Sequence, residues 1–331
     1  MTRPVPPEWG PHTAMWLGFP SHPELWGEQL RPARAEAAAL ALALAGPGAE
    51  KVKLLAAGSE AAAAARDLVG ANEGVEIIDF AFGDIWLRDT GPIFTAAGEA
   101  AAFRFNGWGE KYVLAGDESV AAAIATLAGA RLESHPFVLE GGALEHDGAG
   151  LAITTRACLL NPNRNPLWRE ADAEGALRRA LGVTKTLWLG NGLMNDHTDG
   201  HVDNLARFTA PGVVACPMAF GRGDPNAALY DEAARLLGEA ADTRGEALRV
   251  ARIPSPGRII GEDFRVAPAS HMNFLIANKA VIMPSYERVA SRLAAEGLQE
   301  LFEDRQVIAL PSSALLTGGG SFHCISQQQP A

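Results

Sequence analysis

The chain has 331 residues, of which 48% are hydrophobic and 20% charged, a balance that is typical of a globular protein and excludes a disordered one. The formal net charge is −11, which argues against a nucleic-acid partner and makes a small cation an electrostatically favourable ligand. No Gly/Pro/Ser-rich linker or charge run divides the chain, so we expect one domain over residues 1–331.

At the N-terminus, prolines and a Glu-Trp pair stand where a secretion signal needs a continuous apolar core. The longest apolar runs, such as residues 37–46, are alanine-rich and too short to span a membrane. Three widely spaced cysteines without a CxxC pair argue against a disulfide framework and a zinc knuckle. Together these features predict a reduced, cytoplasmic protein without a membrane partner.

Six stretches carry alanine and leucine at helical spacing, and short β-like runs lie between them. Turn-forming pairs at 147–148, 211–212 and 277–278 predict hairpins. The predicted helices are residues 28–45, 59–69, 117–129, 169–181, 224–240 and 286–302. This alternation of helices and paired strands is typical of an α/β protein.

Residues able to do chemistry recur at a similar place in successive units of the chain. Asp89, Glu140, His201, His271 and His323 are separated by 51, 61, 70 and 52 residues. A period of this length, built from a helix and two or three strands, predicts a closed ring of similar units. In such a ring the corresponding loops converge on the axis, so these residues could meet.

The segment DIWLRDTGP, residues 84–92, embeds Asp84, Arg88 and Asp89 in a β-like apolar run with Trp86. A carboxylate in such surroundings needs a partner, which is either Arg88 or a cationic ligand, and internal pairing is the commoner outcome. Trp108, in FNGWG, is either an aromatic wall of a site or a core tryptophan.

Further along the chain, Glu140 follows the apolar run PFVL, and the glycines after it allow close backbone approach. The alternating segment HVDNLARF predicts a strand with His201 and Asp203 on one face, able to bind one ligand together. A surface strand with its polar residues in water is the alternative. In GGGSFHC, the glycines permit a tight turn that could present Cys324 as a nucleophile, although cysteine is more often a small buried hydrophobe.

These residues combine one cysteine, one histidine and the carboxylates Asp89, Glu140 and Asp203. A peptidase-like Cys-His pair would not need so many carboxylates, whereas a guanidinium does, because it is a planar cation with five N–H donors. Carboxylates can grip its edges with charge-assisted hydrogen bonds worth about 1.5–3 kcal/mol each. The set predicts hydrolysis of a guanidine to a urea with loss of ammonia.

The sequence resembles the agmatine deiminase group of the guanidine-modifying enzymes, which includes bacterial peptidylarginine deiminases. The matching stretches run from Glu8 to Pro330 and are EWGPHTAMWLGFP, WLRDTGP, FNGWGEK, EGGALEHDGAGLAITTRACLLNPNRNP, GHVDN and GGGSFHCISQQQP. The resemblance implies the pentein fold, a fivefold pseudosymmetric α/β-propeller of ββαβ units, in agreement with the repeat.

The resemblance also implies the residue roles. Cys324 would be the nucleophile, His201 the general acid and base, Asp89 and Asp203 the guanidinium clamp, and Glu140 the residue that holds the imidazole. The thiolate would form a covalent amidino intermediate that water then hydrolyses, with no metal and no organic cofactor. We expect His323 to point away from the site, because successive strand side chains face opposite sides.

Agmatine is the favoured substrate over free or peptide-linked arginine, since no basic residue is evident for a carboxylate. Many agmatine deiminases carry an acid four residues before the catalytic histidine, where this chain has His197. Asp196 or Asp199 could substitute for that acid. The residues predicted to line the substrate site are Trp86, Trp108, Asp196, His197 and Gly319. The sequence leaves the oligomeric state open, a homo-oligomer included, and also the pathway.

Two other functions remain as alternatives. Asp199, His201 and Asp203 reproduce the Asp-x-His-x-Asp pattern of a binuclear metal ureohydrolase, but no second Asp-rich cluster follows and Cys324 would have no role. A polyamine-binding protein would also use acids and tryptophans, although such proteins are normally exported. The product distinguishes the two enzymes, because a ureohydrolase releases urea and a deiminase releases ammonia.

Overall fold

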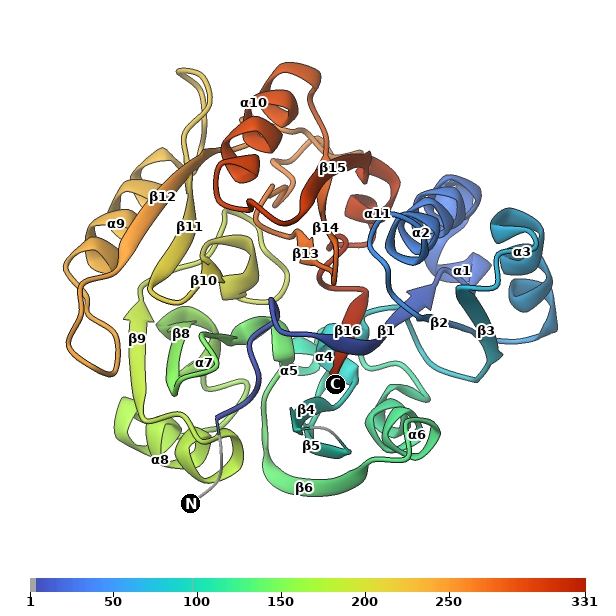
Figure 1. The fold of residues 1–331 in the computed structure, drawn as a ribbon, viewed down its shortest axis with the longest axis horizontal. Coiled ribbons are helices and arrows are strands. Elements are labelled where there is room, and N and C mark those ends of the chain that lie inside the picture. The colour runs from blue at the N-terminus through green and yellow to red at the C-terminus, as the bar shows by residue number, and fades with distance from the viewer. Residues whose placement is uncertain (1–3, 97) are drawn as a thin grey trace.

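The structure is a computed structural model that describes residues 4–96 and 98–331. Within these residues the strands form five small sheets, and Figure 1 shows the sheets arranged around a common centre. The strands are β1 (His12–Phe19), β2 (Val52–Ala56), β3 (Val75–Asp79), β4 (Ile93–Ala96), β5 (Glu99–Arg104), β6 (Arg131–Val138), β7 (Glu145–His146), β8 (Leu151–Thr155), β9 (Lys185–Leu189), β10 (Arg207–Ala210), β11 (Val213–Met218), β12 (Arg249–Pro254), β13 (Leu275–Ile276), β14 (Ala280–Ser285), β15 (Gln306–Pro311) and β16 (Ser326–Pro330).

Four of the five sheets begin with an antiparallel hairpin and continue with a parallel strand. A helix connects the second strand to the third, because parallel strands need a crossover connection. In the remaining sheet the last strand, β16, pairs antiparallel with the first, β1, so the pairing joins the two ends of the ring. The predicted α/β fold of ββαβ units is confirmed.

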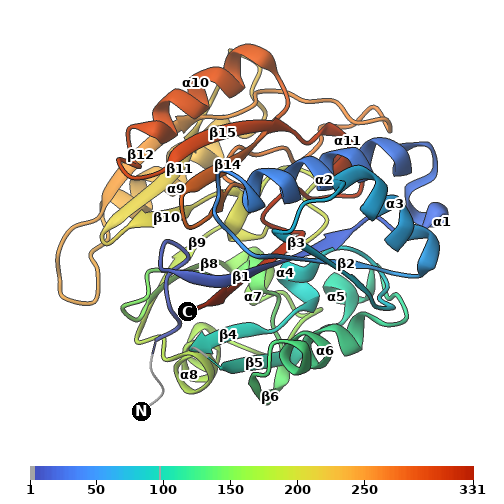
Figure 2. The ribbon, with the colours of Figure 1, turned by 45° about the vertical axis from the view of Figure 1, so that its right-hand side comes forward.

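The helices that make these connections pack on the strands with their alanine-rich faces. Ala33, Ala37, Ala41 and Leu44 of α2 are fully buried, and their small side chains bring the helix close to β1 and β2. Figure 2 shows α2 against these strands and α10 against β14 and β15. The helices are α1 (Pro23–Trp26), α2 (Leu30–Ala45), α3 (Ser59–Val69), α4 (Leu87–Thr90), α5 (Gly107–Glu110), α6 (Val120–Leu127), α7 (Arg156–Leu159), α8 (Glu170–Leu181), α9 (Ala227–Gly238), α10 (Arg288–Gln299) and α11 (Ser313–Thr317).

All six predicted helices are present, and the predicted turns connect β7 to β8, β10 to β11, and β13 to β14. Two segments expected to be extended are not. Leu87–Thr90 forms the helical turn α4, and Val202–Asn204 forms the 3₁₀ turn η4. In η4 the N–H groups of Leu205 and Ala206 donate to the carbonyl of Val202, so strand pairing begins only at Arg207. In the part of the chain that the structure describes, no helix combines the length and apolarity needed to cross a bilayer.

Candidate active site

The loops that lead into the hairpins carry one polar cluster at the centre of the ring. Each of its members lies two to six residues before the first strand of a sheet, and all are buried. The loops meet because α4 and η4 both contact η3 (Gly141–Ala143). The cluster consists of Asp89, Glu140, His201, Asp203, Asn273 and Cys324.

Two residues of the predicted series, His271 and His323, are not members of this cluster. The Nδ1–H of His271 donates to the carbonyl of Pro254 at 2.7 Å, and Nε2 bonds the hydroxyl of Ser291 at 3.0 Å, outside the cluster. Asn273 takes its place, two residues before β13, as Cys324 lies two residues before β16. The recurrence of histidines along the chain was therefore misleading, since the equivalent positions are set by the hairpins.

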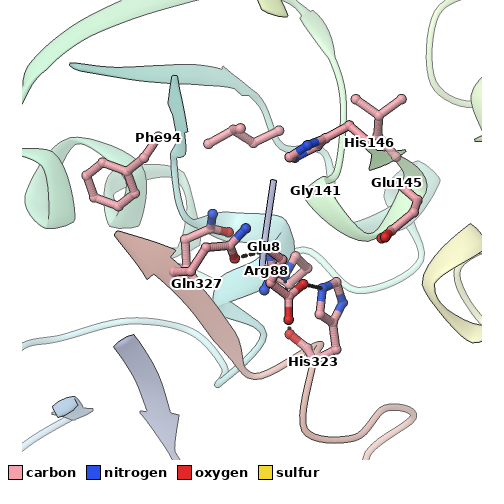
Figure 3. Close-up of a pocket in the computed structure, with 11 residues that line it drawn as sticks. Glu8, Arg88, Phe94, Gly141, Glu145, His146, His323 and Gln327 are labelled. Carbon is pink, nitrogen blue, oxygen red and sulfur yellow. Dashed lines mark hydrogen bonds and ion pairs between the residues drawn. The ribbon is translucent and has the colours of Figure 1, made fainter. Parts of the chain in front are cut away.

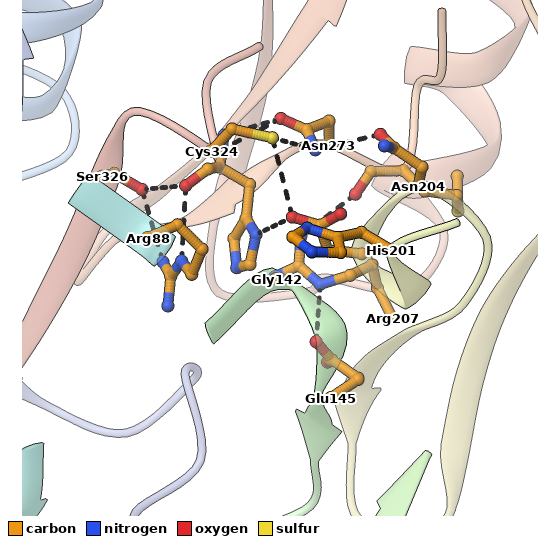
Figure 4. Close-up of polar contacts among 12 residues, drawn as sticks. Arg88, Gly142, Glu145, His201, Asn204, Arg207, Asn273, Cys324 and Ser326 are labelled. Atoms are coloured by element: carbon orange, nitrogen blue, oxygen red, sulfur yellow. Dashed lines mark hydrogen bonds and ion pairs between the residues drawn. The ribbon is translucent and has the colours of Figure 1, made fainter. Parts of the chain in front are cut away.

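Gly142 lies where three of the side chains converge (Figure 4). A Cβ atom at this position would lie 2.5 Å from His201 Nδ1, 3.0 Å from Asp89 Oδ1 and 3.1 Å from Asp203 Oδ2. The Gly142 N–H instead donates to Asp89 Oδ1 at 3.0 Å. The second glycine of EGG thus allows an imidazole and two carboxylates to approach one another, as the close backbone approach predicted from the sequence requires.

Cys324 has no basic group against its sulfur among the described residues. Asn273 Nδ2 donates to Sγ at 3.2 Å, and the thiol faces Asp203 Oδ2 at 3.7 Å. Burial raises the pKa of Cys324 well above its usual value, and the carboxylates of Asp203 and Asp89 raise it further. The thiol is consequently neutral in the free protein and needs a positive charge to ionise.

His201 lies among acidic groups. Its Nδ1 is 3.7 Å from Asp89 Oδ1, and Cys158 and Glu140 lie close by. Burial by itself lowers the pKa of His201, but Asp89, Cys158 and Glu140 outweigh burial and raise the pKa well above its usual value. Glu140 is held in place by Arg164, whose Nε donates to Oε1 at 2.6 Å.

Asp89 does not pair with Arg88, so the internal ion pair expected as the commoner outcome is wrong. Neighbouring residues of a helical turn point in different directions, and the Arg88 guanidinium bonds Gln328 Oε1 at 2.7 Å and Ser326 Oγ at 3.3 Å. Asp89 accepts from Trp108 Nε1 and from the backbone, and no described lysine or arginine pairs with it. Burial raises the pKa of Asp89, as expected for a carboxylate that lacks a full cationic partner.

A cavity of about 250 Å³ opens over Cys324 and Asp89. Its lining is mostly aromatic and glycine-rich, and none of the described residues in it is a lysine or arginine. The predicted substrate-binding residues that line it are Trp86, Trp108, His197 and Gly319. Trp108 is both an aromatic wall and a buried core residue, 7% exposed. The cavity therefore suits an elongated cation with apolar methylene groups.

Asp196 is not among the lining residues. Its Oδ1 accepts from the backbone N–H and the hydroxyl of Thr198, so the carboxylate is turned into its own loop. Asp199 is likewise bound, by Lys111 Nζ and Arg164 at 2.6 Å each. Neither acid replaces the one expected four residues before His201, where His197 Nδ1 bonds the Tyr112 hydroxyl at 2.9 Å.

Sequence reasoning missed a second acid of the cavity as a site residue. Asp84 Oδ2 accepts from Trp86 Nε1 at 2.8 Å, and Oδ1 accepts from Trp26 Nε1 at 3.2 Å. Burial raises the pKa of Asp84. The DIWLRD segment carried the signal, since Asp84 shares the apolar surroundings that drew attention to Asp89.

His323 and Cys324 both reach Asp203 from their loop, because Asp203 Oδ2 faces the thiol and also bonds the His323 ring. His323 bonds Asp203 Oδ2 at 2.8 Å and Glu8 Oε2 at 3.2 Å and lines a separate polar cavity of about 20 Å³ (Figure 3). The expectation that His323 points away from the site is not met, because both residues belong to a turn before β16 and not to a strand, and the His323 ring contacts Asp203 of the cluster.

The three glycines act differently from the expected sharp end of a strand. They follow the short helix α11, and a Cβ at Gly320 would come within 2.5 Å of the Trp86 ring and 3.0 Å of Cys324 Cβ. Gly319 adopts φ +106°, a conformation that favours glycine. The glycines therefore let Trp86 pack directly beside the thiol.

A ring of ββαβ sheets with a thiol, an imidazole and carboxylates gathered at its centre defines a guanidine-modifying enzyme of the pentein fold. Residues 4–330 match the family of Porphyromonas-type peptidyl-arginine deiminases, and the chain belongs to this family. It is thus a hydrolase of C–N bonds in amidines, and the resemblance seen in the sequence is confirmed.

Known relatives cover nearly the whole chain. It is 35% identical to the agmatine deiminase of Ectopseudomonas mendocina over 354 residues, 99% of this chain and 95% of that protein. The structure of Enterococcus faecalis agmatine deiminase superposes with a TM-score of 0.92 at 29% identity, covering 99% and 96%. A substrate-bound cysteine-to-serine variant of C. jejuni agmatine deiminase gives 0.88 at 25% identity, covering 99% and 96%.

Proposed function

We propose that the protein hydrolyses agmatine to N-carbamoylputrescine and ammonia through a covalent intermediate on Cys324. The observation that carries the proposal is Asp89, a buried carboxylate beside the thiol that no described lysine or arginine neutralises. A carboxylate buried in this way favours a cationic ligand. The names of the relatives, agmatine deiminases, support the same substrate.

In this mechanism Asp89 and Asp203 bind the N–H groups of the guanidinium. Asp203 Oδ2 lies 3.7 Å from the sulfur, so a guanidinium bound to this oxygen brings its carbon next to Cys324. The bound cation places a positive charge next to the sulfur, which lowers the pKa of the thiol, and the thiol proton goes to solvent. The substrate therefore activates its own nucleophile.

The thiolate then adds to the guanidinium carbon and forms a neutral tetrahedral adduct. Protonated His201, which the surrounding acids favour, gives a proton to one nitrogen, and ammonia leaves with the C–N electron pair. A cationic amidino thioether remains on Cys324. Neutral His201 next takes a proton from water, the hydroxide adds to the carbon, and the thiol leaves with the hydroxyl proton as the carbamoyl product forms.

The cavity favours agmatine over free arginine, whereas peptide-linked arginine, whose α-carboxyl is an amide, stays an alternative for the product assay. The α-carboxylate of arginine would meet no lysine or arginine among the described lining residues and would lie near Asp84. The methylene groups of agmatine suit the rings of Trp86 and Tyr112, and its distal ammonium suits the electronegative faces of these rings. No dedicated acid at position 197 is required by this arrangement.

The ureohydrolase alternative loses its main support. Asp199 is bound by Lys111 and Arg164, so it does not join His201 and Asp203 in a binuclear metal set. A polyamine-binding protein would leave the thiol of Cys324, set beside Asp89 and Asp203, without a use.

The decisive experiment incubates the protein with agmatine and a chelator and quantifies ammonia, urea and N-carbamoylputrescine. Ammonia and N-carbamoylputrescine in equal amounts are expected, with slower turnover of arginine and of an arginyl peptide. Urea as the product would establish ureohydrolase chemistry. Faster turnover of arginine would overturn the substrate assignment.

A further inference from the structure

Cys158 is a buried thiol that the proposed mechanism does not use. It lies in the short helix α7 beside His201 and Glu140. A sulfur, an imidazole nitrogen and a carboxylate oxygen from these three residues all lie within 4.8 Å of one another, and all three residues are buried. Three possible metal ligands thus converge: a soft sulfur, an imidazole nitrogen of intermediate softness and a hard carboxylate oxygen.

The imidazole of His201 is available to such a cluster. The side chain is 1% exposed, and within the described residues neither Nδ1 nor Nε2 has a hydrogen-bond partner. An unpartnered buried polar group destabilises the folded protein, so a ligand that occupies a ring nitrogen recovers stability. The acids around His201 make a cation the favourable ligand.

We propose that Glu140, Cys158 and His201 form a binding site for a thiophilic divalent metal ion such as Zn²⁺, and that occupation of this site inhibits the enzyme. Sulfur, nitrogen and oxygen donors together form a typical zinc set. Bond lengths of about 2.0–2.3 Å place tetrahedral zinc ligands roughly 3.3–3.8 Å apart, so the three side chains need to close by about 1 Å. Three protein ligands leave the fourth position for water.

The surroundings support the three ligands. Arg164 Nε donates to Glu140 Oε1 at 2.6 Å, which fixes the carboxylate while leaving Oε2 for the metal. Asp89 lines the substrate cavity and lies 3.7 Å from His201 Nδ1, so the cluster adjoins the route by which a cationic substrate enters. Mg²⁺ and Ca²⁺, which prefer oxygen ligands, should bind poorly here.

Binding exchanges protons for metal. The ion displaces the thiol proton of Cys158 and any proton on the coordinating nitrogen of His201, and both protons go to solvent. The metal then occupies a lone pair that His201 needs for proton transfer and adds positive charge where the guanidinium binds. Only the inhibition rests on the proposed function, since binding itself does not depend on catalysis.

Cobalt spectroscopy tests the site directly. In a Cys324→Ser variant titrated with Co²⁺, Cys158 is the thiol of the cluster, and a thiolate-to-cobalt charge-transfer band in the near ultraviolet is expected. Adding Cys158→Ser should abolish the band, whereas adding Cys216→Ser, a buried cysteine elsewhere in the fold, should retain it. Thermal melts verify that each variant is folded. Absence of the band in Cys324→Ser, or its persistence after Cys158→Ser, would overturn the proposal.

Inhibition provides a second measurement. Zn²⁺ should inhibit the wild type reversibly, and Cys158→Ser should raise the inhibitory concentration about tenfold or more, relative to its own metal-free rate. Equal inhibition of both proteins would place the effect of zinc elsewhere and refute the inhibitory role. If the protein lacks deiminase activity, the proposed function fails, and the cobalt spectrum still decides whether the metal site exists.

Discussion

Replacing Asp89 by asparagine removes the negative charge on which the proposed guanidinium site depends while keeping the shape of the side chain. In the structure Oδ2 accepts from Trp108 Nε1 and Oδ1 accepts from the N–H of Gly142, both at 3.0 Å. An amide has one oxygen, so one of these donors meets an NH₂ group in the variant. The substrate meanwhile loses an anionic acceptor next to the reacting carbon.

The expected loss follows from the burial of the pair. Removing one partner of a buried, hydrogen-bonded charge pair costs about 2–5 kcal/mol. At about 1.36 kcal/mol per factor of ten, kcat/KM for agmatine should fall roughly 30- to 5,000-fold. The free energy of unfolding should change much less. Burial raises the pKa of Asp89, which means that the buried charge destabilises the folded protein. Replacing the charge by a neutral amide removes this destabilisation, which offsets the hydrogen bond lost where a donor meets the NH₂ group.

The assay measures ammonia release over a range of agmatine concentrations, together with a thermal melt of each protein. Asp117→Asn is a matched control, because Asp117 is also buried and accepts from the N–H of Gly83 at 2.9 Å, but does not line the cavity. Its kcat/KM should stay within about threefold of the wild type. If Asp89→Asn also stays within about that range, Asp89 is structural and the reasoning about the clamp is wrong.

Three further predictions concern the thiol and the tail of the substrate. Cys324→Ser should abolish turnover without changing the fold, whereas Cys216→Ser should retain turnover. In mass spectra of the wild type, a halogenated amidine should label Cys324. Labelling of another cysteine alone would contradict the assignment. Burial and the neighbouring carboxylates raise the pKa of Cys324, so inactivation by neutral iodoacetamide should accelerate as the pH rises beyond the usual thiol range. Inactivation by a cationic haloamidine should reach its full rate at lower pH. Superimposable pH profiles for the two reagents would argue against activation of the thiol by the substrate. His197→Glu should lower KM for agmatine roughly 5- to 30-fold, which corresponds to about 1–2 kcal/mol, with little change in kcat. Guanidines without the distal amine should gain nothing, and an unchanged KM for agmatine would mean that position 197 does not contact that amine.

The sequence predicts the ring and most of the central residues because both depend on patterns that repeat along the chain. Helical spacing, turn dipeptides and the recurring unit are local signals, and they predict units of a helix with two or three strands, which the family resemblance specifies as ββαβ. Asp89, Glu140, His201, Asp203 and Cys324 stand out because acids, a histidine and a cysteine occur within apolar or glycine-rich segments. The structure brings all five together at the centre of the ring.

The failures have a common cause, which is that contacts from other units decide the local conformation. Alternation in HVDNLARF predicts a strand, yet Asn204 is held by Asn273 and Ser270, residues 69 and 66 positions away. These bonds stabilise a turn that no short-range pattern encodes. Asn273 itself escaped notice because an asparagine carries no obvious chemistry, although it donates to the sulfur of Cys324.

Arg88 shows how a wrong local pairing conceals a role in the architecture. Its backbone N–H donates to the carbonyl of Cys324 at 3.0 Å, and its guanidinium bonds Ser326 and Gln328 of β16. The loop that carries Asp89 is thereby tied to the turn that carries Cys324. Since β16 closes the ring by pairing with β1, the thiol reaches its partners only in the closed ring. Because the Arg88 guanidinium is bound to β16, it does not pair with Asp89. The same contact holds the loop of Cys324 next to the loop of Asp89, so it both closes the ring and leaves the Asp89 carboxylate free to bind a cationic substrate.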